Sequence, residues 1–312
     1  MAGRTNTEAK PLLAIVGPTA SGKTEAALEV ARALGAEIVS VDSATVYRGM
    51  DVGTAKPTVE QRVSVPHHLI DVVEPSESFT VARYQELARR AIDDIRSRGH
   101  RVMLVGGSGL YLRAVADDLA FPPTDPTVRD EIRREAATVG ARGLHRRLEE
   151  LDPVAARRIE PDNVRRTVRA LEVAEITGRP FSSFAEAWDR YPNDRLRAAG
   201  VQIPRSVLAN RIEHRVRAQV DGGLLDEVRG LVDRGLSGWL TASKVIGYAE
   251  LARHLQGELD LQDAIARTCK RTRALARRQL AWFRRDPRIR WFEAQETGAT
   301  TLVVEMTEYL RG

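Results

Sequence analysis

Hydrophobic positions in the first third of the chain form short apolar runs separated by amphipathic stretches. The runs at residues 11–16, 37–41 and 101–105 each have the length and composition of a buried strand. Between them, apolar residues recur at helical spacing over 24–34 and 81–98, and the second stretch ends beside a glycine that can cap a helix. Strands alternating with helices predict a parallel α/β sheet with ligands at the carboxyl ends of its strands.

The pattern changes after residue 121, where prolines interrupt the chain. Residues 126–191 are charged and helical, without a convincing strand, and indicate an α-helical insertion. Short apolar runs at 67–73, 201–203 and 301–304 predict further strands. The remainder of the C-terminal third has helical spacing broken by glycines.

Residues 17–24 form a glycine-rich motif, Gly-Pro-Thr-Ala-Ser-Gly-Lys-Thr, that matches G-x-x-x-x-G-K-[ST] between a predicted strand and a predicted helix. Its backbone N–H groups can turn inward around an anion, and the helix N-terminus adds partial positive charge. Lys23 can reach a terminal phosphate, and the Thr24 hydroxyl can coordinate Mg²⁺. The motif does not distinguish ATP, GTP and an isoprenyl diphosphate. The predicted diphosphate or nucleotide site consists of Gly17, Pro18, Thr19, Ala20, Ser21, Gly22, Lys23 and Thr24.

These patterns together predict an α/β fold with a P-loop NTPase-like parallel sheet core. We expect the core to be built from residues 11–121 and 197–312 and to be interrupted by an α-helical insertion domain over 122–196.

Two features beside the motif bear on its chemistry. The run 101–105 leads into Gly106-Gly107-Ser108, without the acidic residue that holds magnesium in ATPases, which disfavours ordinary nucleotide hydrolysis. Asp42 follows the run 37–41, so its carboxylate is expected to face the same crevice as the phosphate loop. There it can accept a proton or bind a metal through water, or it can simply cap the following turn.

Arginine and lysine crowd one stretch near the C-terminus. Lys270, Arg273, Arg277 and Arg284 fall on roughly one helical face, which favours a surface that follows a phosphate backbone. The cluster of Arg165, Arg166 and Arg169 is equally consistent with a solvated helix face. Of the neighbouring aromatic residues, Trp282 is a candidate for stacking on a base, whereas Phe283 is predicted to belong to the core.

The amino-acid composition excludes only a few classes of protein and site. The 312 residues carry 48 Lys and Arg against 43 Asp and Glu, a net charge of +5 that suits a polyanionic partner without requiring one. A single cysteine, Cys269, rules out an intrachain disulfide and argues against a thiolate zinc site. No apolar run approaches the roughly 20 residues that a membrane span needs. We therefore expect a cytoplasmic protein with no membrane contact, and nothing in the sequence demands more than a monomer.

Several blocks of the sequence resemble the tRNA dimethylallyltransferases. The order and spacing of these blocks extend over about residues 12 to 290. Ser108 stands where the family commonly has threonine, and Thr45 and Ala281 stand where glutamine and threonine are common. Besides the phosphate loop, the blocks are residues 41–57, 66–71, 105–111, 163–172, 246–248 and 277–284.

The resemblance implies transfer of a dimethylallyl group from dimethylallyl diphosphate to the N6 amine of the adenosine 3′ of the anticodon in tRNA, with release of diphosphate and Mg²⁺ as cofactor. It implies that the helical insertion grips the anticodon stem-loop. Asp42 corresponds to the general base, and Lys23, Arg215 and Thr19 correspond to groups at the diphosphate. The implied tRNA contacts are Asp42, Ser43, Ala44, Thr45, Ser108, Arg129, Arg165, Arg166, Arg169, Lys244, Gly247, Tyr248, Arg277, Arg278, Gln279, Trp282 and Arg284.

Three other functions share some of these features. A small-molecule kinase would use the same loop with Asp42 as base for a hydroxyl, but it does not explain the basic stretch. A transferase acting on free adenine nucleotides would need neither the basic stretch nor the insertion. A non-catalytic RNA-binding protein would not need Lys23, Thr24 and Asp42 together.

Overall fold

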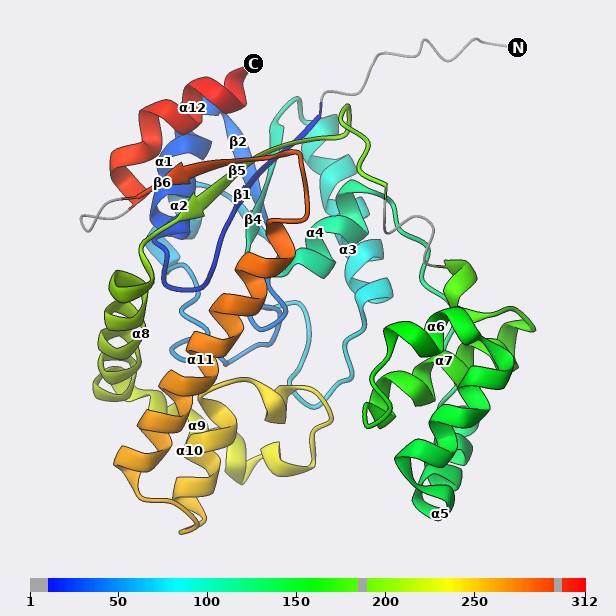
Figure 1. Ribbon diagram of the computed structural model, residues 1–312. Coiled ribbons are helices and arrows are strands. Elements are labelled where there is room, and N and C mark those ends of the chain that lie inside the picture. Colours follow the sequence, from blue (N-terminus) through cyan, green and yellow to red (C-terminus); the bar gives the residue numbers. More distant parts are fainter. Residues whose placement is uncertain (1–10, 185–189, 295–298) are drawn as a thin grey trace, which may run out of the picture. The chain divides into compact units, whose positions relative to one another are not determined.

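The computed structural model describes residues 11–184, 190–294 and 299–312 (Figure 1). The chain divides into two compact units: Met1–Ala116 with Pro192–Gly312, and Asp117–Tyr191. The second unit is inserted into the first along the chain. Its bounds precede the expected 122–196 by a few residues, because a strand of the first unit already begins at Leu196.

The first unit is built on a six-stranded sheet in the order β3-β2-β4-β1-β5-β6. Every neighbouring pair is parallel, which confirms the predicted α/β core. The strands are β1 Leu12–Val16, β2 Ala36–Ser40, β3 His67–His68, β4 Arg101–Gly106, β5 Leu196–Gln202 and β6 Ile289–Glu293.

Three strand predictions need adjustment. The run 67–73 contributes only the short β3, and the run 201–203 is the end of the longer β5. The prediction of a strand at 301–304 is wrong, because these residues lie in a 3-10 turn, Ala299–Leu302, and in helix α12, Val303–Arg311. The buried side chains of Leu302, Met306 and Leu310 recur every four residues, as a helix requires. β6 occupies the sheet edge instead.

Helices cover both faces of the sheet (Figure 1). Alternate residues of β1 point into two hydrophobic clusters, one packed with α3 and α4 and the other with α1, α8 and α12. All five residues of β1 are buried, as expected of a central parallel strand. The helices of this unit are α1 Lys23–Leu34, α2 Val59–Ser64, α3 Val81–Ser97, α4 Gly109–Ala116, α8 Arg205–Gln219, α9 Leu225–Asp233, α10 Tyr248–Leu255, α11 Leu261–Phe283 and α12, with a π-helical turn at Val220–Leu224 between α8 and α9.

The second unit is helical throughout its described part and has its own core. Leu144, Leu148 and Leu171 are fully buried in it. Its elements are α5 Pro126–Leu151, kinked at Gly140, α6 Pro153–Arg158, α7 Val164–Thr177 and a 3-10 turn at Phe181–Phe184. Across both units, none of the helices in the described residues has the length and apolar character to cross a membrane.

Candidate active site

The phosphate loop connects β1 to α1, as the motif predicted. Gly22 precedes α1 with a φ of 84°, in the left-handed region that favours glycine, and Ala20 shares that region with a φ of 62°. This backbone leaves the first N–H groups of α1 directed at the loop, where they can donate hydrogen bonds to an anion. The Lys23 ammonium donates a hydrogen bond to the Pro18 carbonyl at 3.2 Å.

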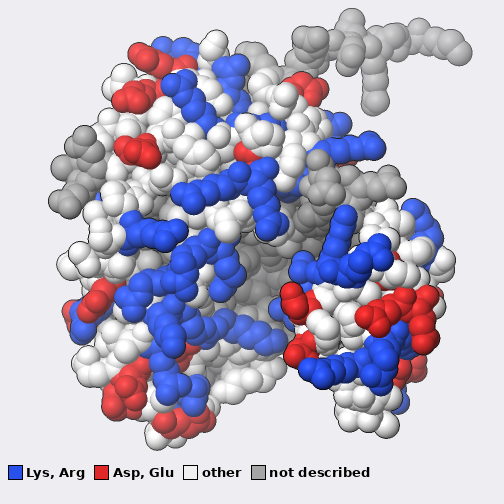
Figure 2. All heavy atoms as spheres, viewed as in Figure 1, with Lys and Arg blue, Asp and Glu red and all other residues white. Residues whose placement is uncertain are grey.

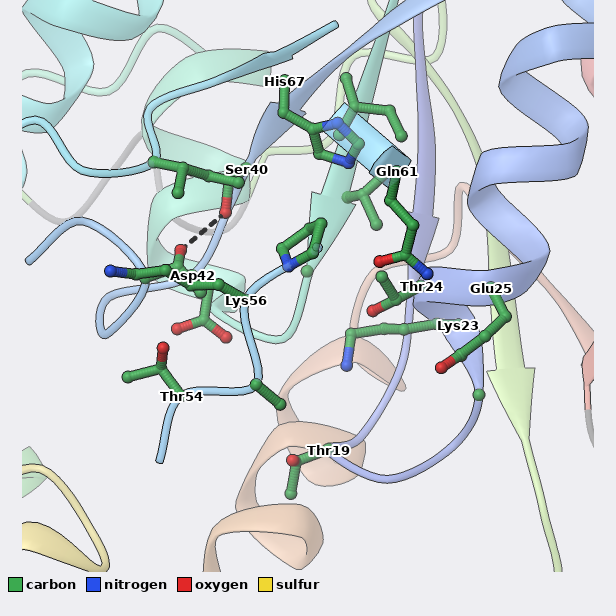
Figure 3. A pocket seen from close by; sticks show the side chains of 18 of the residues that line it. Thr19, Lys23, Thr24, Glu25, Ser40, Asp42, Thr54, Lys56, Gln61 and His67 are labelled. Carbon is green, nitrogen blue, oxygen red and sulfur yellow. Dashed lines mark hydrogen bonds between the residues drawn. The ribbon is translucent and has the colours of Figure 1, made fainter. Parts of the chain in front are cut away.

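A cavity of about 600 Å³ opens beside the loop at the carboxyl ends of β1, β2 and β4. The phosphate loop, α8 and residues 54–58 form its walls. Lys23 and Asp42 point into it from opposite sides, and the hydroxyl groups of Thr19 and Thr24 border it (Figure 3). The predicted base and the predicted diphosphate groups therefore share one cavity.

Burial shapes the electrostatics of this cavity. Desolvation lowers the pKa of Lys23 to about 8, and the nearby Arg215 adds to the effect while Asp42 and Glu25 oppose it. Burial also lowers the pKa of Arg215, whose guanidinium donates to the Thr19 hydroxyl at 3.5 Å. Neither cation forms an ion pair with another residue that the structure describes. Two desolvated cations without a paired acid form a site for an anion.

Asp42 caps the turn after β2 and also faces the cavity. One carboxylate oxygen accepts a hydrogen bond from the Ala44 N–H at 2.8 Å and so caps the turn after β2. The same carboxylate borders the cavity (Figure 3). Behind it, the buried rings of Tyr84 and Tyr111 stack with centroids 4.0 Å apart, and the Tyr84 hydroxyl donates to the Ser40 carbonyl. Neither tyrosine was predicted as a site residue, although Tyr111 belongs to the block 105–111.

Gly106 explains the absence of an acidic residue at the end of β4. A Cβ atom at this position would lie 2.4 Å from the Val41 carbonyl oxygen, because the chain after β2 crosses directly over it. The Ser108 N–H donates to that same oxygen at 3.0 Å. A side chain at residue 106 would require this backbone to shift, so an acidic residue that could hold magnesium as in ATPases does not fit at this position.

Helix α11 approaches the phosphate loop through Gln279. Its side-chain carbonyl accepts a hydrogen bond from the Thr19 N–H at 2.9 Å, although the two residues are 260 positions apart. Cβ atoms at Gly107 and Gly109 would lie 2.2 Å from the Gln279 amide and 1.8 Å from the Trp282 ring. The glycines after β4 thus allow α11 to pack against the site. Within this helix Phe283 is buried, which confirms its predicted place in the core.

The exposed face of α11 is strongly basic, and Figure 2 shows Lys and Arg side chains along the helix. Arg271 is engaged by Glu250, and Arg284, just beyond the helix, donates to Gln202 at 2.9 Å. Arg277 and Arg278 are exposed and form no ion pair with any described residue. Arg267 and Lys270 on α11 share these properties, so all four cations can bind phosphates from outside.

The four arginines of the helical unit that were predicted to contact tRNA fall into two groups. Arg129 on α5 and Arg169 on α7 both bind the fully buried carboxylate of Glu172 on α7, at 3.0 and 2.9 Å, and the first of these pairs joins α5 to α7. Arg165 and Arg166 are exposed on α7. The first two arginines stabilise the unit, and the second two present charge to solvent.

The remaining predicted tRNA contacts differ in accessibility. Ser43 and Lys244 are exposed. The buried Thr45 hydroxyl is hydrogen-bonded with Ser40 at 3.0 Å and borders the cavity. The Tyr248 side chain is fully buried, so it cannot contact RNA in this structure; its hydroxyl donates to Glu227 at 2.6 Å. Tyr248 therefore supports the site from within.

Two further cavity residues carry charge. Lys56 is almost completely buried, and its ammonium donates to Asp51 at 2.6 Å and to Asp71 at 2.5 Å. Arg211 lies one helical turn before Arg215 on α8 and borders the cavity with it. The sequence placed Lys56 in a polar segment suited to a pocket, whereas Arg211 could have been found from its spacing of four residues to Arg215.

Known proteins resemble this chain over almost its whole length. A family model described as IPP transferase matches residues 45–286. The tRNA dimethylallyltransferase of Desulforudis audaxviator is 49% identical over 289 residues, covering 92% of this chain and 93% of that protein. The corresponding protein of Moorella thermoacetica is 51% identical over 293 residues, covering 91% and 90%.

Solved structures give the same result. The tRNA isopentenylpyrophosphate transferase of Bacillus halodurans is 40% identical with a TM-score of 0.71, covering 97% of this chain and 96% of that one. A eukaryotic dimethylallyltransferase acting on tRNA, at 24% identity and a TM-score of 0.75, shares the fold. A family model over most of the chain and relatives at about half identity lead to one conclusion: this chain belongs to the IPP transferase family.

Proposed function

We propose that this protein transfers the dimethylallyl group of dimethylallyl diphosphate to the N6 amine of the adenosine 3′ of the anticodon in tRNA, releasing diphosphate. The activity named for its relatives supports the proposal. The observation that carries it is the cavity in which the Asp42 carboxylate faces Lys23, Thr19 and Arg215. All the groups invoked belong to one chain, so the monomer is the proposed working unit.

The phosphate loop would hold the diphosphate of the donor. Lys23 and Arg215 supply positive charge, and backbone N–H groups at the start of α1 supply hydrogen bonds. The Ser21 hydroxyl is fully buried and has no hydrogen-bond partner among the described residues. A buried hydroxyl without a partner costs about 1–3 kcal/mol, but Ser21 does not line the cavity and is not one of the donors proposed for the diphosphate.

The acceptor chemistry requires a base. The exocyclic amine of adenine is a weak nucleophile, because its lone pair is delocalised into the ring. As the bond between N6 and the allylic carbon forms, the bond from that carbon to the diphosphate oxygen breaks and its electron pair leaves with diphosphate. Asp42 takes the proton from N6, a contribution of about 10² to 10⁴ in rate. The cations across the cavity stabilise the charge that develops on the leaving group.

A magnesium ion fits this arrangement, because oxygen atoms of the protein and of the diphosphate can bind it together. No group of three or more His, Cys, Asp or Glu in the described part of the chain could form a metal cage. Mg²⁺ at phosphate sites commonly uses one or two protein oxygens and completes its shell with phosphates and water. The Thr24 hydroxyl is the proposed direct ligand, and Asp42 can act through water. The ion would neutralise charge on the diphosphate.

The RNA side of the proposal rests on α11 and α7. Arg277 and Arg278 on α11, and Arg165 and Arg166 on α7, are exposed cations suited to backbone phosphates. An adenosine in a loop can leave its stack at a cost of only a few kcal/mol, and so can reach a cavity that would be closed to a paired base.

A transfer assay tests the function against its alternatives. The protein is incubated with Mg²⁺, labelled dimethylallyl diphosphate and either unmodified tRNA, AMP or ATP. We expect label in tRNA alone. Label in AMP or ATP would indicate an enzyme of free nucleotides, and no transfer to any acceptor would refute the proposal.

A further inference from the structure

One wall of the cavity is a loop whose first residues bind a carboxylate that lies outside the cavity. Residues 51–58, here called the wall loop, face the phosphate loop across the cavity, which Thr54 to Thr58 line directly. Figure 3 shows Thr54 and Lys56 on this side. Ala55 has a φ of 48°, in the left-handed region, a conformation that persists only where the surroundings fix it.

The carboxylate belongs to Glu227 on α9. One of its oxygens accepts from the N–H groups of Asp51 and Val52 at 2.7 and 2.9 Å. The other accepts from the Gly53 N–H at 3.2 Å and from the Tyr248 hydroxyl at 2.6 Å. Three successive N–H groups form an anion-binding concavity, and four donors use the whole acceptor capacity of a carboxylate.

Two neighbours complete this attachment. The Gln219 amide donates to the carbonyls of Val52 and Gly53 at 2.6 and 3.1 Å, so both edges of the loop backbone are held. The Tyr248 ring lies against Gly53, where a Cβ atom would be only 2.5 Å from it. The wall loop is therefore held by α8, α9 and α10 through groups that do not line the cavity themselves.

We propose that Glu227 is a positioning residue for the transfer reaction: it sets the wall loop at the distance from the phosphate loop that donor binding requires. The inference rests on the proposed function, because it takes the donor diphosphate to be the occupant of the cavity. Glu227 touches no substrate. Its effect passes through the backbone of residues 51–53 to the cavity-lining residues that follow.

The test compares variants that keep side-chain volume. In Glu227→Gln an amide nitrogen replaces one of the two oxygens that accept hydrogen bonds from the N–H groups of residues 51–53. The new NH₂ group is itself a donor and cannot accept these hydrogen bonds. Tyr248→Phe removes one of the four donors and keeps the ring under Gly53. Asp226→Asn is the matched control, because Asp226 is the exposed neighbour on α9 and, among the described residues, forms an ion pair with Arg229 alone.

The quantity measured is the dissociation constant of labelled dimethylallyl diphosphate, by equilibrium dialysis with Mg²⁺, alongside that of tRNA by filter binding. We expect Glu227→Gln to weaken donor binding about tenfold or more and Tyr248→Phe about two- to threefold, since three donors remain. The double variant should match Glu227→Gln alone, because the hydroxyl acts through the carboxylate. Binding of tRNA should change less than twofold in every variant, and Asp226→Asn should match the wild type.

Several results would overturn the inference: unchanged donor binding in Glu227→Gln, additive effects in the double variant, or a parallel loss of tRNA affinity, which would indicate general unfolding. The measurement does not depend on catalysis. A wild type that binds the donor but transfers nothing to tRNA would refute the proposed function, and the comparison of donor affinities would still decide the role of Glu227. A wild type that does not bind the donor would refute both.

Discussion

Raising the pH should lower kcat/KM for dimethylallyl diphosphate, because the Lys23 side chain loses its positive charge. Burial favours the neutral amine, so the pKa of about 8 places the charged form below that pH and the neutral form above it. The protonated fraction falls from about 0.9 at pH 7 to about 0.1 at pH 9. If the diphosphate requires the charged form, kcat/KM for dimethylallyl diphosphate should fall roughly tenfold over this range.

The assay follows kcat/KM for the donor at saturating tRNA in steps of pH, with a slope approaching −1 expected above about pH 8. Lys23→Arg keeps its charge throughout, so whatever activity it retains should vary little with pH. A wild-type profile that stays flat to about pH 9 would refute the reasoning, since it would mean that Lys23 keeps its charge there or that its charge is not used.

Three further outcomes follow from the site and its supports. Asp42→Asn should lower the single-turnover rate constant of transfer at least about 100-fold while the Kd for tRNA stays within a few-fold. An unchanged rate constant would exclude this carboxylate as the base. Arg278→Ala should reduce the slope of log Kd for tRNA against log salt by about 1, and an unaltered slope would remove this residue from the interface. Glu172→Ala should lower the free energy of unfolding by about 2–3 kcal/mol in chemical denaturation. This is less than for a fully buried ion pair, because the guanidinium groups of Arg129 and Arg169 are partly exposed. A loss below about 0.5 kcal/mol would contradict the structural role of these ion pairs.

Local patterns predicted the parts of the site that adjoin one another in the chain. The phosphate loop was predicted from glycine, lysine and threonine at fixed spacing between a strand and a helix. The position of Asp42 was predicted from the strand that precedes it. Both lie where the pattern indicates, because parallel strands end at the same edge of the sheet.

Contacts between distant segments could not be predicted in this way. Nothing near Gln279 in the sequence indicates that it binds the Thr19 N–H, and nothing near Tyr248 indicates that its hydroxyl donates to Glu227. The strand expected at 301–304 failed for a related reason. Its β-branched residues favour a strand locally, but tertiary packing of Leu302 with the helical positions after it decides the outcome.

The central claim is the identity of the acceptor atom, and nucleoside mapping tests it most directly. Unmodified tRNA is incubated with the protein, Mg²⁺ and dimethylallyl diphosphate, then digested and sequenced by mass spectrometry. The account predicts one dimethylallyl group on N6 of the adenosine 3′ of the anticodon, absent when Asp42→Asn replaces the wild type. A dimethylallyl group at any other position, or a tRNA left unmodified by the wild type, would contradict it.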